Sequence, residues 1–363
     1  MTRYLLCGGG TAGHVNPLLA VADRLRERDA DAVIRVLGTA EGLEARLVPA
    51  RGYELLVVRR LPFPRRPGIA AVRFPGRFSE LVSGIRALII EHEIDVVVGF
   101  GGYVSAPAYL AARRERVPIV VHEANARPGL ANRLGARFTR FVGVAFRATP
   151  LRGSRFVGMP LRGEIERLDR HSARPAACAA LGLEPRKLTL VVTGGSLGAR
   201  RINETIASSA PLVLGAAWQV LHITGERSEI DYPELSDYHV LKYCDRMDLA
   251  LAAADLVLAR AGSSTVSELT ALAIPAVYVP LAVGNGEQAL NARDAVDAGA
   301  ALVVDNDDFT PEWVADSLLA LLQDRTMLAS MAASATAVGV RDGTARMVAL
   351  IDEAVGGRVA LRS

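Results

Sequence analysis

Cysteine is scarce in this sequence of 363 residues. Only Cys7, Cys178 and Cys244 are present, and no two of them form a CxxC pair. An odd number of cysteines without that spacing argues against a disulfide framework and against a zinc site, and it is typical of the reducing cytoplasm. Cys7 lies in a predicted buried strand, where packing is the simplest role.

Membrane spans and targeting signals are also missing from the pattern. The chain enters a predicted strand at once, so no signal peptide is expected. The two longest uncharged stretches, 205–225 and 269–286, contain prolines, glycines and polar residues and are interpreted as helix–loop–strand pieces of a core. Half of the residues are hydrophobic and no low-complexity tract occurs. We therefore expect a folded, soluble chain that can still touch a membrane.

The whole chain has a small net charge, but its two halves carry opposite net charges. Residues 1–160 carry 24 arginines against 13 acidic residues, and residues 161–363 carry 18 basic against 26 acidic residues. The two parts thus have net charges of +11 and −8, which sum to the formal +3 of the whole chain. The basic part is expected to meet an anionic surface or substrate.

Short apolar runs alternate with amphipathic stretches through most of the chain. Predicted strands such as Val33–Leu37 and Leu256–Ala259 are separated by predicted helices such as Ser79–Glu91. This alternation predicts parallel sheets covered by helices, in two α/β domains of ordinary size. The boundary is expected near Gly158–Arg162, and a last helix near 343–354 is free to return to the first domain.

Two strand–glycine–helix transitions lie about half a chain apart. Residues 4–14 read YLLCGGGTAGH and residues 188–199 read LTLVVTGGSLGA. Glycines at such a turn let the backbone approach a phosphate, and the helix N-terminus offers free N–H groups and a partial positive charge. The first loop lacks the GxGxxG spacing of a dinucleotide site, and no acidic residue ends the second strand. Two such loops predict similar domains facing a shared cleft, which suits an enzyme that joins two phosphorylated substrates.

Polar residues follow further predicted strands of the first half. The runs GFGGYVS at 99–105 and HEAN at 122–125 stand at strand ends, where open α/β sheets bind ligands. Glu123 and Asn125 either contact a ligand or organise their own loop. His14 either caps its loop or contacts an anion or a hydroxyl, because a helix N-terminus favours the neutral imidazole that base catalysis needs.

The second half repeats this theme. The run RAGSSTVSE at 260–268 is a third strand–glycine–helix transition, with Glu268 expected in the first helical turn. There Glu268 either balances the helix dipole or accepts hydrogen bonds from two neighbouring hydroxyls of a ribose. The run GNGEQALNA at 284–292 gathers amides and carboxylates, a composition that suits sugar hydroxyls.

Residues 59–86 break the alternation. They hold seven arginines and a single acid, Glu80, among prolines and aromatic residues. The segment is either a solvated loop before a helix or a patch that inserts apolar side chains among anionic lipid headgroups. Nucleic acid is disfavoured, because lysines and a recognition-helix pattern are missing.

Seven motifs in chain order resemble those of the MurG family of UDP-N-acetylglucosamine (UDP-GlcNAc) transferases. They are GGGTAGH, GGYVS, HEAN followed by Gly129 and Asn132, GMPLR, GGSLGA, GSSTVSE and EQALNA. The resemblance implies the GT-B architecture: an acceptor and membrane-binding domain at 1–158 plus about 341–363, and a UDP-sugar donor domain at 159–340. It also implies transfer to undecaprenyl-diphosphate-linked muramoyl-pentapeptide (lipid I), which gives lipid II for peptidoglycan, at the cytoplasmic face of the cell membrane.

The resemblance further implies site residues. The catalytic candidates are His14 and Glu123. The acceptor side comprises Thr11, Gly13, His14, Tyr103, Glu123, Asn125 and Asn132. The donor side comprises Thr11, Ala12, Gly13, Asn125, Arg162, Gly195, Ser196, Cys244, Ser263, Ser264, Glu268, Glu287, Gln288 and Asn291. The first glycine loop would hold the lipid diphosphate, Arg162 and Ser196 the donor diphosphate, and Glu268 the ribose.

Four positions depart from residues that are frequent in the family. They are Ala124, Met159, Leu197 and Glu287. Only Glu287 weakens an assignment, because a carboxylate accepts hydrogen bonds from sugar hydroxyls but cannot donate them as an amide can.

The chemistry agrees with the resemblance. Inverting transfer needs a base for the acceptor hydroxyl and positive charge for the departing UDP. Arg162 and a helix N-terminus can supply that charge, and Asp305–Asp308 is interpreted as a solvated turn, so neither a metal nor a cofactor is expected. Both His14 and Glu123 remain candidates for the base, with His14 favoured.

Three other functions stay open at this point. They are a GT-B transferase for another lipid such as diacylglycerol, a sugar-nucleotide 2-epimerase, and a non-catalytic sugar-nucleotide-binding or membrane-scaffold subunit. For the family resemblance itself, a cell-wall synthesis complex is a candidate partner. Polar sets in both halves disfavour the non-catalytic subunit, which needs only one of them.

Overall fold

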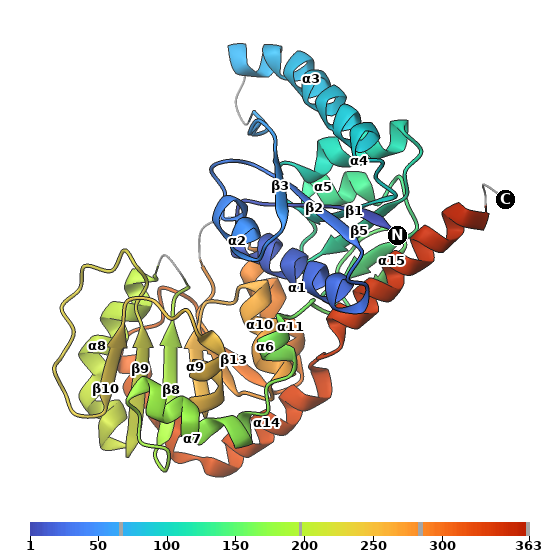
Figure 1. Ribbon diagram of the computed structural model, residues 1–363. Coiled ribbons are helices and arrows are strands. Elements are labelled where there is room, and N and C mark those ends of the chain that lie inside the picture. Colours follow the sequence, from blue (N-terminus) through green and yellow to red (C-terminus); the bar gives the residue numbers. More distant parts are fainter. Residues whose placement is uncertain (65–67, 196–197, 282–285, 361–363) are drawn as a thin grey trace. The chain divides into compact units, whose positions relative to one another are not determined.

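The computed structural model describes residues 1–64, 68–195, 198–281 and 286–360 (Figure 1). Two compact units divide the chain: Met1–Arg162 together with Asp342–Ser363, and Gly163–Arg341. The first unit extends to Arg162, the end of the expected boundary range Gly158–Arg162, and so includes residues 159–162, which the sequence analysis assigned to the donor domain.

A parallel sheet of seven strands forms the centre of the first unit, in the order β3-β2-β1-β4-β5-β6-β7. The strands are β1 Arg3–Gly8, β2 Val33–Gly38, β3 Glu54–Val57, β4 Val96–Gly101, β5 Ile119–Glu123, β6 Val142–Val144 and β7 Ser154–Phe156. The helices are α1 Ala12–Arg28, α2 Glu44–Ala50, α3 Ile69–Glu91, α4 Ser105–Arg114, α5 Leu130–Gly135 and α15 Gly343–Ala360. The strand order reverses between β1 and β4, and open α/β sheets bind their ligands at such a switch point.

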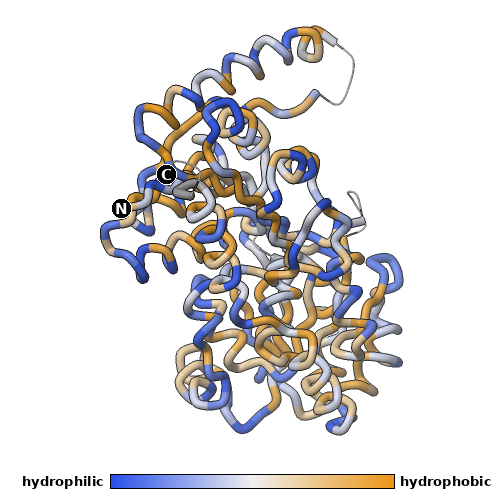
Figure 2. The backbone as a smooth tube through the Cα atoms, turned by 90° about the vertical axis from the view of Figure 1, so that its right-hand side faces the viewer, coloured by the Kyte–Doolittle hydropathy of each residue, from blue (hydrophilic) through white to orange (hydrophobic). Residues whose placement is uncertain are grey.

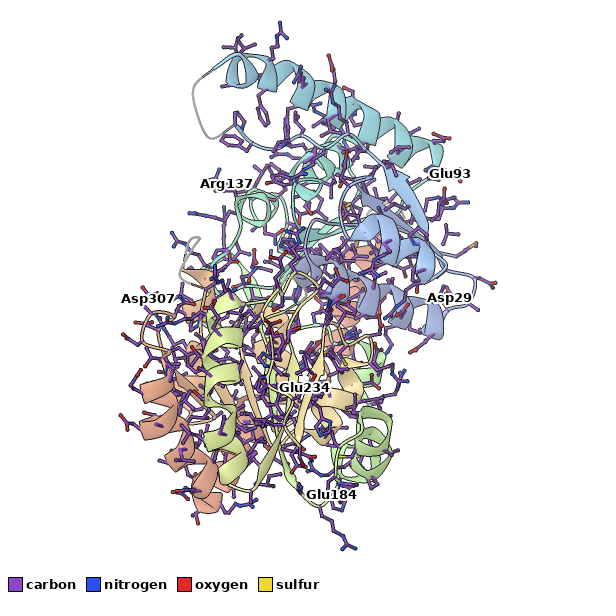
Figure 3. The ribbon with its side chains drawn as sticks, turned by 90° about the vertical axis from the view of Figure 1, so that its left-hand side faces the viewer. Asp29, Glu93, Arg137, Glu184, Glu234 and Asp307 are labelled. Atoms are coloured by element: carbon purple, nitrogen blue, oxygen red, sulfur yellow. The ribbon has the colours of Figure 1, made fainter. Side chains whose placement is uncertain are left out.

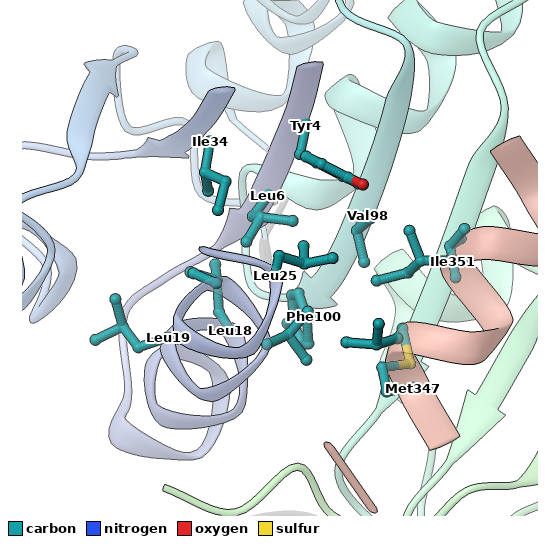
Figure 4. Packing of buried hydrophobic residues seen from close by; sticks show 14 of the residues in the cluster. Tyr4, Leu6, Leu18, Leu19, Leu25, Ile34, Val98, Phe100, Met347 and Ile351 are labelled. Carbon is teal, nitrogen blue, oxygen red and sulfur yellow. The ribbon is translucent and has the colours of Figure 1, made fainter. Parts of the chain in front are cut away.

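Helices cover both faces of this sheet because its strands are apolar on both sides. On one face, Leu6 and Val98 pack against Leu18 of α1 and Ile351 of α15 (Figure 4). On the other face, α3, α4 and α5 bury a second cluster that includes Ile85. The C-terminal helix α15 is thus part of the core of the first unit.

A parallel sheet of six strands forms the second unit, in the order β10-β9-β8-β11-β12-β13. The strands are β8 Leu188–Thr193, β9 Trp218–Ile223, β10 Tyr238–Leu241, β11 Leu256–Ala259, β12 Ala276–Tyr278 and β13 Ala301–Val303. The helices are α6 Gly163–Glu166, α7 Arg170–Leu181, α8 Arg200–Gly215, α9 Met247–Ala253, α10 Ser263–Ala271, α11 Glu287–Asp297, α12 Pro311–Trp313, α13 Leu319–Gln323 and α14 Arg325–Val338. A π-helical turn, Val314–Leu318, joins α12 to α13. The predicted class, two α/β units built on parallel sheets, is confirmed.

Hydropathy follows this layering. Hydrophobic segments run through the interior of each unit and hydrophilic segments lie on outer loops (Figure 2). Charged side chains at the outer turns are labelled in Figure 3: Asp29, Glu93, Arg137, Glu184, Glu234 and Asp307. Within the described ranges, no helix is long and apolar enough to cross a membrane.

Candidate active site

Three loops meet at one edge of the first sheet, because β1, β4 and β5 are neighbours and parallel. The first loop leads from Gly8 to α1, the second from Gly101 to α4, and the third from Glu123 to α5. These loops carry the residues that the sequence assigns to the acceptor side.

The first loop presents the N-terminus of α1. Thr11 is the N-cap in an extended conformation, its side chain makes no capping hydrogen bond, and the first turn of this fully described helix holds no acidic residue. Thr11 and Ala12 are exposed. The N–H groups at this end can therefore receive an anion, with support from the helix dipole.

The His14 ring is oriented by the first loop itself. Its Nδ1 lies 3.2 Å from the carbonyl oxygen of Gly9 and 3.3 Å from the Oγ1 of Thr11. A carbonyl only accepts, so in the neutral ring the bond to Gly9 selects the tautomer with the proton on Nδ1 and the lone pair on Nε2. A Cβ at Gly101 would lie 2.9 Å from Nε2, so the glycine there leaves room for this ring.

The second loop packs tightly onto the first. Gly101 and Gly102 have φ angles of +101° and +83°, and a Cβ at Gly102 would come within 2.7 Å of the Gly9 carbonyl oxygen. Ser105 fixes this arrangement, because its hydroxyl donates to the carbonyls of Gly101 (2.7 Å) and Cys7 (3.2 Å). Both glycines are thus required by backbone conformation and by close approach.

Tyr103, at the tip of the second loop, remains 45% exposed. The guanidinium of Arg60 lies over its ring, 5.7 Å from the centroid. Both side chains border a pocket of about 90 Å³ whose other walls include Gly10 of the first loop. The pocket also has a buried carboxylate, Glu44, which the sequence analysis missed.

Glu123 lies buried at the end of β5, with 2% of its surface exposed. Its Oε1 accepts from the backbone N–H of Asn125 (2.9 Å), and its Oε2 accepts from the N–H of Gly129 (2.9 Å) and from the Nδ2 of Asn132 (3.0 Å). Both carboxylate oxygens are therefore engaged in holding the third loop. Of the two roles that the sequence left open for Glu123, this geometry favours the loop-organising one.

Asn132 belongs to the same hydrogen-bond network. Its Nδ2 also donates to the carbonyl of His122 (3.0 Å), and its Oδ1 accepts from the buried hydroxyl of Tyr109 (2.7 Å). Only 1% of Asn132 is exposed. Asn125 is half-buried on the loop that this network shapes and is the more accessible of the two amides.

His122 is fully buried between Glu123 and the core. Its Nε2 lies 3.1 Å from the carbonyl oxygen of Gly158, in the strap that leads toward the unit boundary. Burial lowers the pKa of this imidazole to about 4, although the hydrogen bond to Gly158 opposes the shift. His122 is therefore neutral at physiological pH and acts as a structural link.

Arg162, assigned to the donor diphosphate, is the last residue of the first unit and is half-buried. The preceding residue, Leu161, is fixed on both sides: its N–H donates to the Oγ1 of Thr344 (3.1 Å), and that hydroxyl donates to the Leu161 carbonyl (3.0 Å). The GMPLR strap is thus anchored to the start of α15.

In the second unit, the glycine loop after β8 turns at Gly195 and Gly198, whose φ angles are +88° and +81°. A Cβ at Gly198 would lie 2.4 Å from the carbonyl oxygen of Thr224, so no other residue fits there. Ser196, expected at the donor diphosphate, and Leu197 lie outside the described residues.

The N-terminus of α10 follows β11, at the carboxyl edge of the second sheet. Its N-cap is Gly262, Ser263 is 5% exposed, and its fully described first turn contains no acidic residue. The hydroxyl of Ser264 is buried and has no hydrogen-bond partner among the residues that the structure describes. A buried hydroxyl without a partner at a helix N-terminus is a feature that a bound anion would satisfy.

Glu268 corrects one expectation. The helix begins at Ser263, so Glu268 is in its second turn and not in its first. A carboxylate in that position is poorly placed to balance the helix dipole, which acts within the first turn. The dipole-capping alternative is therefore disfavoured, and the hydroxyl-binding alternative remains.

The remaining donor candidates surround the same edge of the second sheet. Cys244 is half-buried in the loop between β10 and α9. Glu287 is the first residue of α11, and the Oε1 of Gln288 accepts from the N–H of Leu281 (2.9 Å). Asn291 is 1% exposed and donates to the carbonyl of Ala261 (3.3 Å), which ties α11 to the loop before α10.

Comparison with known proteins agrees with this arrangement. The N-terminal domain model of glycosyltransferase family 28 matches residues 4–144, and the C-terminal domain model of the same family matches residues 189–347. A UDP-N-acetylglucosamine–N-acetylmuramyl-(pentapeptide) pyrophosphoryl-undecaprenol N-acetylglucosamine transferase of Leifsonia xyli is 63% identical over 351 residues, which are 97% of this chain and 98% of that protein. The chain belongs to the MurG family.

Other MurG relatives support the assignment. The transferase of the same name from Streptomyces coelicolor is 49% identical over 98% of this chain and 99% of its own length. The crystal structure of Acinetobacter baumannii MurG superposes with a TM-score of 0.78 at 28% identity and covers 97% of this chain and 100% of that one. A UDP-GlcNAc 2-epimerase from Neisseria meningitidis has a TM-score of 0.68 at 13% identity, which shows a common fold alone.

The positions where this MurG chain departs from the frequent family residues are mostly interior. Ala124 and Met159 are buried, with 0% and 2% of their surface exposed, so they act through packing. Leu197 lies outside the described residues. Glu287, half-buried at the start of α11, is the one departure at a described donor candidate.

Proposed function

We propose that this chain is an inverting glycosyltransferase that moves GlcNAc from UDP-GlcNAc to muramoyl-pentapeptide linked to undecaprenyl diphosphate. The 63% identity over 97% of the chain to a relative that carries this activity in its name is the observation that supports it most. The product, lipid II, feeds peptidoglycan assembly and hence cell shape and division.

The acceptor hydroxyl would be deprotonated by His14. Its Nε2 carries the lone pair, because the Gly9 carbonyl holds the proton on Nδ1. Glu123 is a weaker candidate, since its oxygens already accept from the N–H groups of Asn125 and Gly129. In our proposal, Glu123 keeps the third loop in shape and His14 removes the proton.

The acceptor diphosphate would bind at the N-terminus of α1. The N–H of Gly10 is already donated to Glu44 (2.8 Å), so the donors that remain in this loop are those of Thr11, Ala12 and Gly13. These groups and the helix dipole suit a diphosphate. Tyr103 and Asn125 would contact the sugar or its substituents.

The donor would bind to the second unit. The buried hydroxyl of Ser264 and the N-terminus of α10 supply donors for the diphosphate, together with the loop after β8. Glu268 would accept from the ribose hydroxyls. The departing UDP carries negative charge, which these donors and Arg162 would stabilise in the transition state.

The first half of α3 would attach the protein to the cytoplasmic face of an anionic membrane. Ile69 and Val72 are 73% and 81% exposed, and Phe63, Phe74 and Phe78 form a run of ring contacts with centroids 5.3 and 5.5 Å apart. Arg73 and Arg77 are exposed beside them. Apolar side chains flanked by arginines suit insertion among anionic headgroups, and lipid I is anchored in such a layer. Arg65 and Arg66, which the sequence adds to this segment, lie outside the described residues.

Radiolabelled UDP-GlcNAc and a short-chain lipid I analogue test the proposal. We expect label on the analogue, with inversion at the anomeric carbon, and none on diacylglycerol. Turnover of UDP-GlcNAc without an acceptor would support an epimerase or a hydrolase, and binding without turnover a non-catalytic subunit. Either outcome would overturn the proposal.

A further inference from the structure

Glu44 is the most enclosed carboxylate near the proposed acceptor loops, and no motif points to it. It is the first residue of α2, and only 1% of its surface is exposed. A buried carboxylate is costly unless hydrogen bonds satisfy it, so its partners indicate why it is retained.

The partners of Glu44 come from two different loops. Its Oε2 accepts from the N–H of Gly10 (2.8 Å), on the loop after β1. Its Oε1 accepts from the N–H and the Oγ1 of Thr39 (both 2.9 Å), on the loop after β2. These backbone and hydroxyl donors outweigh burial, which acts in the opposite direction, and they hold the pKa of Glu44 below its usual value. The side chain therefore clamps the two loops together as an anion.

Three glycines make room for this carboxylate. A Cβ at Gly9 would lie 2.4 Å from its Oε1, one at Gly42 would lie 2.0 Å from its Oε2, and one at Gly38 would lie 2.5 Å from its Cγ. None of these three described glycines has a positive φ, so the backbone conformation does not demand them. Glycine is required at these three positions because the Glu44 side chain occupies the space that a Cβ would fill.

The clamp leads directly to His14. Gly9, whose Cα faces the Glu44 carboxylate, presents its carbonyl oxygen to the Nδ1 of His14 at 3.2 Å. From the other side, Gly102 packs on the same carbonyl. The position of the Gly9 carbonyl, and with it the direction of the His14 ring, is thus set by Glu44 on one side and by the second loop on the other.

We propose that Glu44 is a positioning residue of the transfer reaction: by clamping the Gly9–Gly10 turn, it holds the carbonyl that keeps the proton on His14 Nδ1 and Nε2 free for the acceptor hydroxyl. The inference rests on the proposed function for the identity of the reaction. It assigns no contact between Glu44 and substrate.

The test is Glu44→Gln, which preserves shape but replaces one acceptor oxygen with an NH₂ that cannot accept. The amide then has an acceptor for only one of the two backbone N–H groups, so the bond to the N–H of Gly10 or the bond to the N–H of Thr39 must be lost, while the Thr39 hydroxyl can accept from the new NH₂. Because small misplacements of catalytic groups cost about 10²-fold in rate, we expect kcat with the lipid I analogue to fall by about that factor. The KM for UDP-GlcNAc should stay within about twofold, since the proposed donor residues near α10 are in the other unit.

A second readout does not depend on activity. With ¹⁵N-labelled histidine, the wild-type ring of His14, identified by its loss in His14→Gln, should show a protonated Nδ1 and an unprotonated Nε2. In Glu44→Gln the ring should show a mixture of both tautomers. If the wild type fails to transfer GlcNAc at all, the proposed function fails, and this spectrum still decides whether Glu44 controls the ring.

The matched control is Asp23→Asn, in the same unit. Asp23 is a part-buried carboxylate that accepts from the hydroxyl of Tyr53 (2.8 Å) and pairs with Arg51, so its loss should lower stability without altering kcat. Should Glu44→Gln not fold, Gly42→Ala replaces it, because the added methyl displaces the carboxylate without touching Gly9 or His14. Wild-type kcat together with a wild-type His14 spectrum in the folded variant would overturn the proposal.

Discussion

The glycine loops after β1 and after β8 share a sequence pattern but differ in what their glycines make room for. In the first loop, Gly9 gives space to the carboxylate of Glu44, and the N–H of Gly10 is donated to it. In the second loop, a Cβ at Gly194 would lie 2.4 Å from the backbone nitrogen of Ala199, and Gly198 packs on the carbonyl of Thr224. Gly194 and Gly198 thus face neighbouring backbone, and Gly195 faces open space, so none of the described glycines of this loop makes room for a charge.

A glycine-rich turn thus specifies the shape of the backbone but not the charges around it. The buried carboxylate of Glu44 weakens the attraction of the Gly9–Gly10 turn for a diphosphate. In our proposal the diphosphate therefore binds at the N-terminus of α1, Thr11–Gly13. The first loop also orients a histidine, so we assign proton transfer to the first unit and binding of the departing UDP to the second.

His14→Gln should have the largest effect. Removal of a general base lowers the rate by 10²–10⁴-fold in other enzymes, and we expect kcat to fall about 10³-fold while UDP-GlcNAc binds as before. Steady-state kinetics and isothermal titration calorimetry measure the two quantities. His92→Gln, at the C-terminal end of α3, is the control and should keep full activity. If His14→Gln retains more than about a tenth of kcat, another group removes the proton.

The strands of both units were largely predictable, including short ones such as β11, but three short strands were missed. The predicted strands Val33–Leu37 and Ile119–His122, which are mostly apolar, correspond to β2 and β5. The missed strands, β6, β7 and β10, are 3 or 4 residues long and depend on pairing with a neighbour, which a local pattern cannot show.

The placement of the candidate residues was predictable where they cluster along the chain. His14 lies at the start of α1 and the HEAN run at the end of β5, as a strand end and a helix start in the sequence predict. Glu44 was missed because its partners, Gly10 and Thr39, belong to separate loops and its own surroundings resemble an ordinary helix start. Glu268 was placed one turn too early because no residue before Ser263 marks the start of α10 except Gly262.

The second unit should lose stability in acid. His222 is buried between the hydroxyl of Tyr238 (2.6 Å) and the Oδ1 of Asn203 (3.1 Å), and burial lowers its pKa to about 3. Below about pH 6.5 the imidazole of His222 binds a proton in the unfolded chain but not in the folded unit. The stability that neutral His222 gives the folded unit is therefore complete above that pH and is lost as the pH falls. Between pH 7 and pH 4 we expect a loss of about 3 kcal/mol in the free energy of unfolding from this group.

Urea unfolding followed by tryptophan fluorescence measures this loss, because Trp218 and Trp313, the only tryptophans, both lie in the second unit. His222→Gln should be less stable at pH 7 and should show a flatter dependence on pH. Parallel curves for the variant and the wild type would exclude His222 as the source.

The double variant Arg73→Ser and Arg77→Ser should weaken binding to anionic vesicles. Each arginine near such a surface contributes about 1 kcal/mol, so we expect a loss of about 30-fold in sedimentation assays at low salt. Activity on a soluble acceptor should be unchanged. The control is Arg26→Ser with Arg28→Ser, on α1 and hence on the opposite face of the sheet. If both double variants lost vesicle binding equally, the net charge of the protein, and not the position of Arg73 and Arg77, would explain the loss.

Ser264→Ala should raise the KM for UDP-GlcNAc about tenfold, the value of one hydrogen bond to a charged group. Ser267→Ala, on the same helix, is the control and should leave this KM unchanged. A wild-type KM in Ser264→Ala would remove the buried hydroxyl from the donor site.

EDTA should have no effect on the rate, since the charge of UDP is assigned to Arg162 and to helix N-termini. Restoration of a lost rate by Mg²⁺ after chelation would contradict this assignment.

The position of the donor diphosphate tests the division of labour most directly. In a crystal structure with UDP-GlcNAc, we predict the diphosphate beside the Ser264 hydroxyl at the N-terminus of α10. A diphosphate bound instead at Thr11–Gly13, with the end of α10 empty, would reverse the roles of the two units and contradict the account.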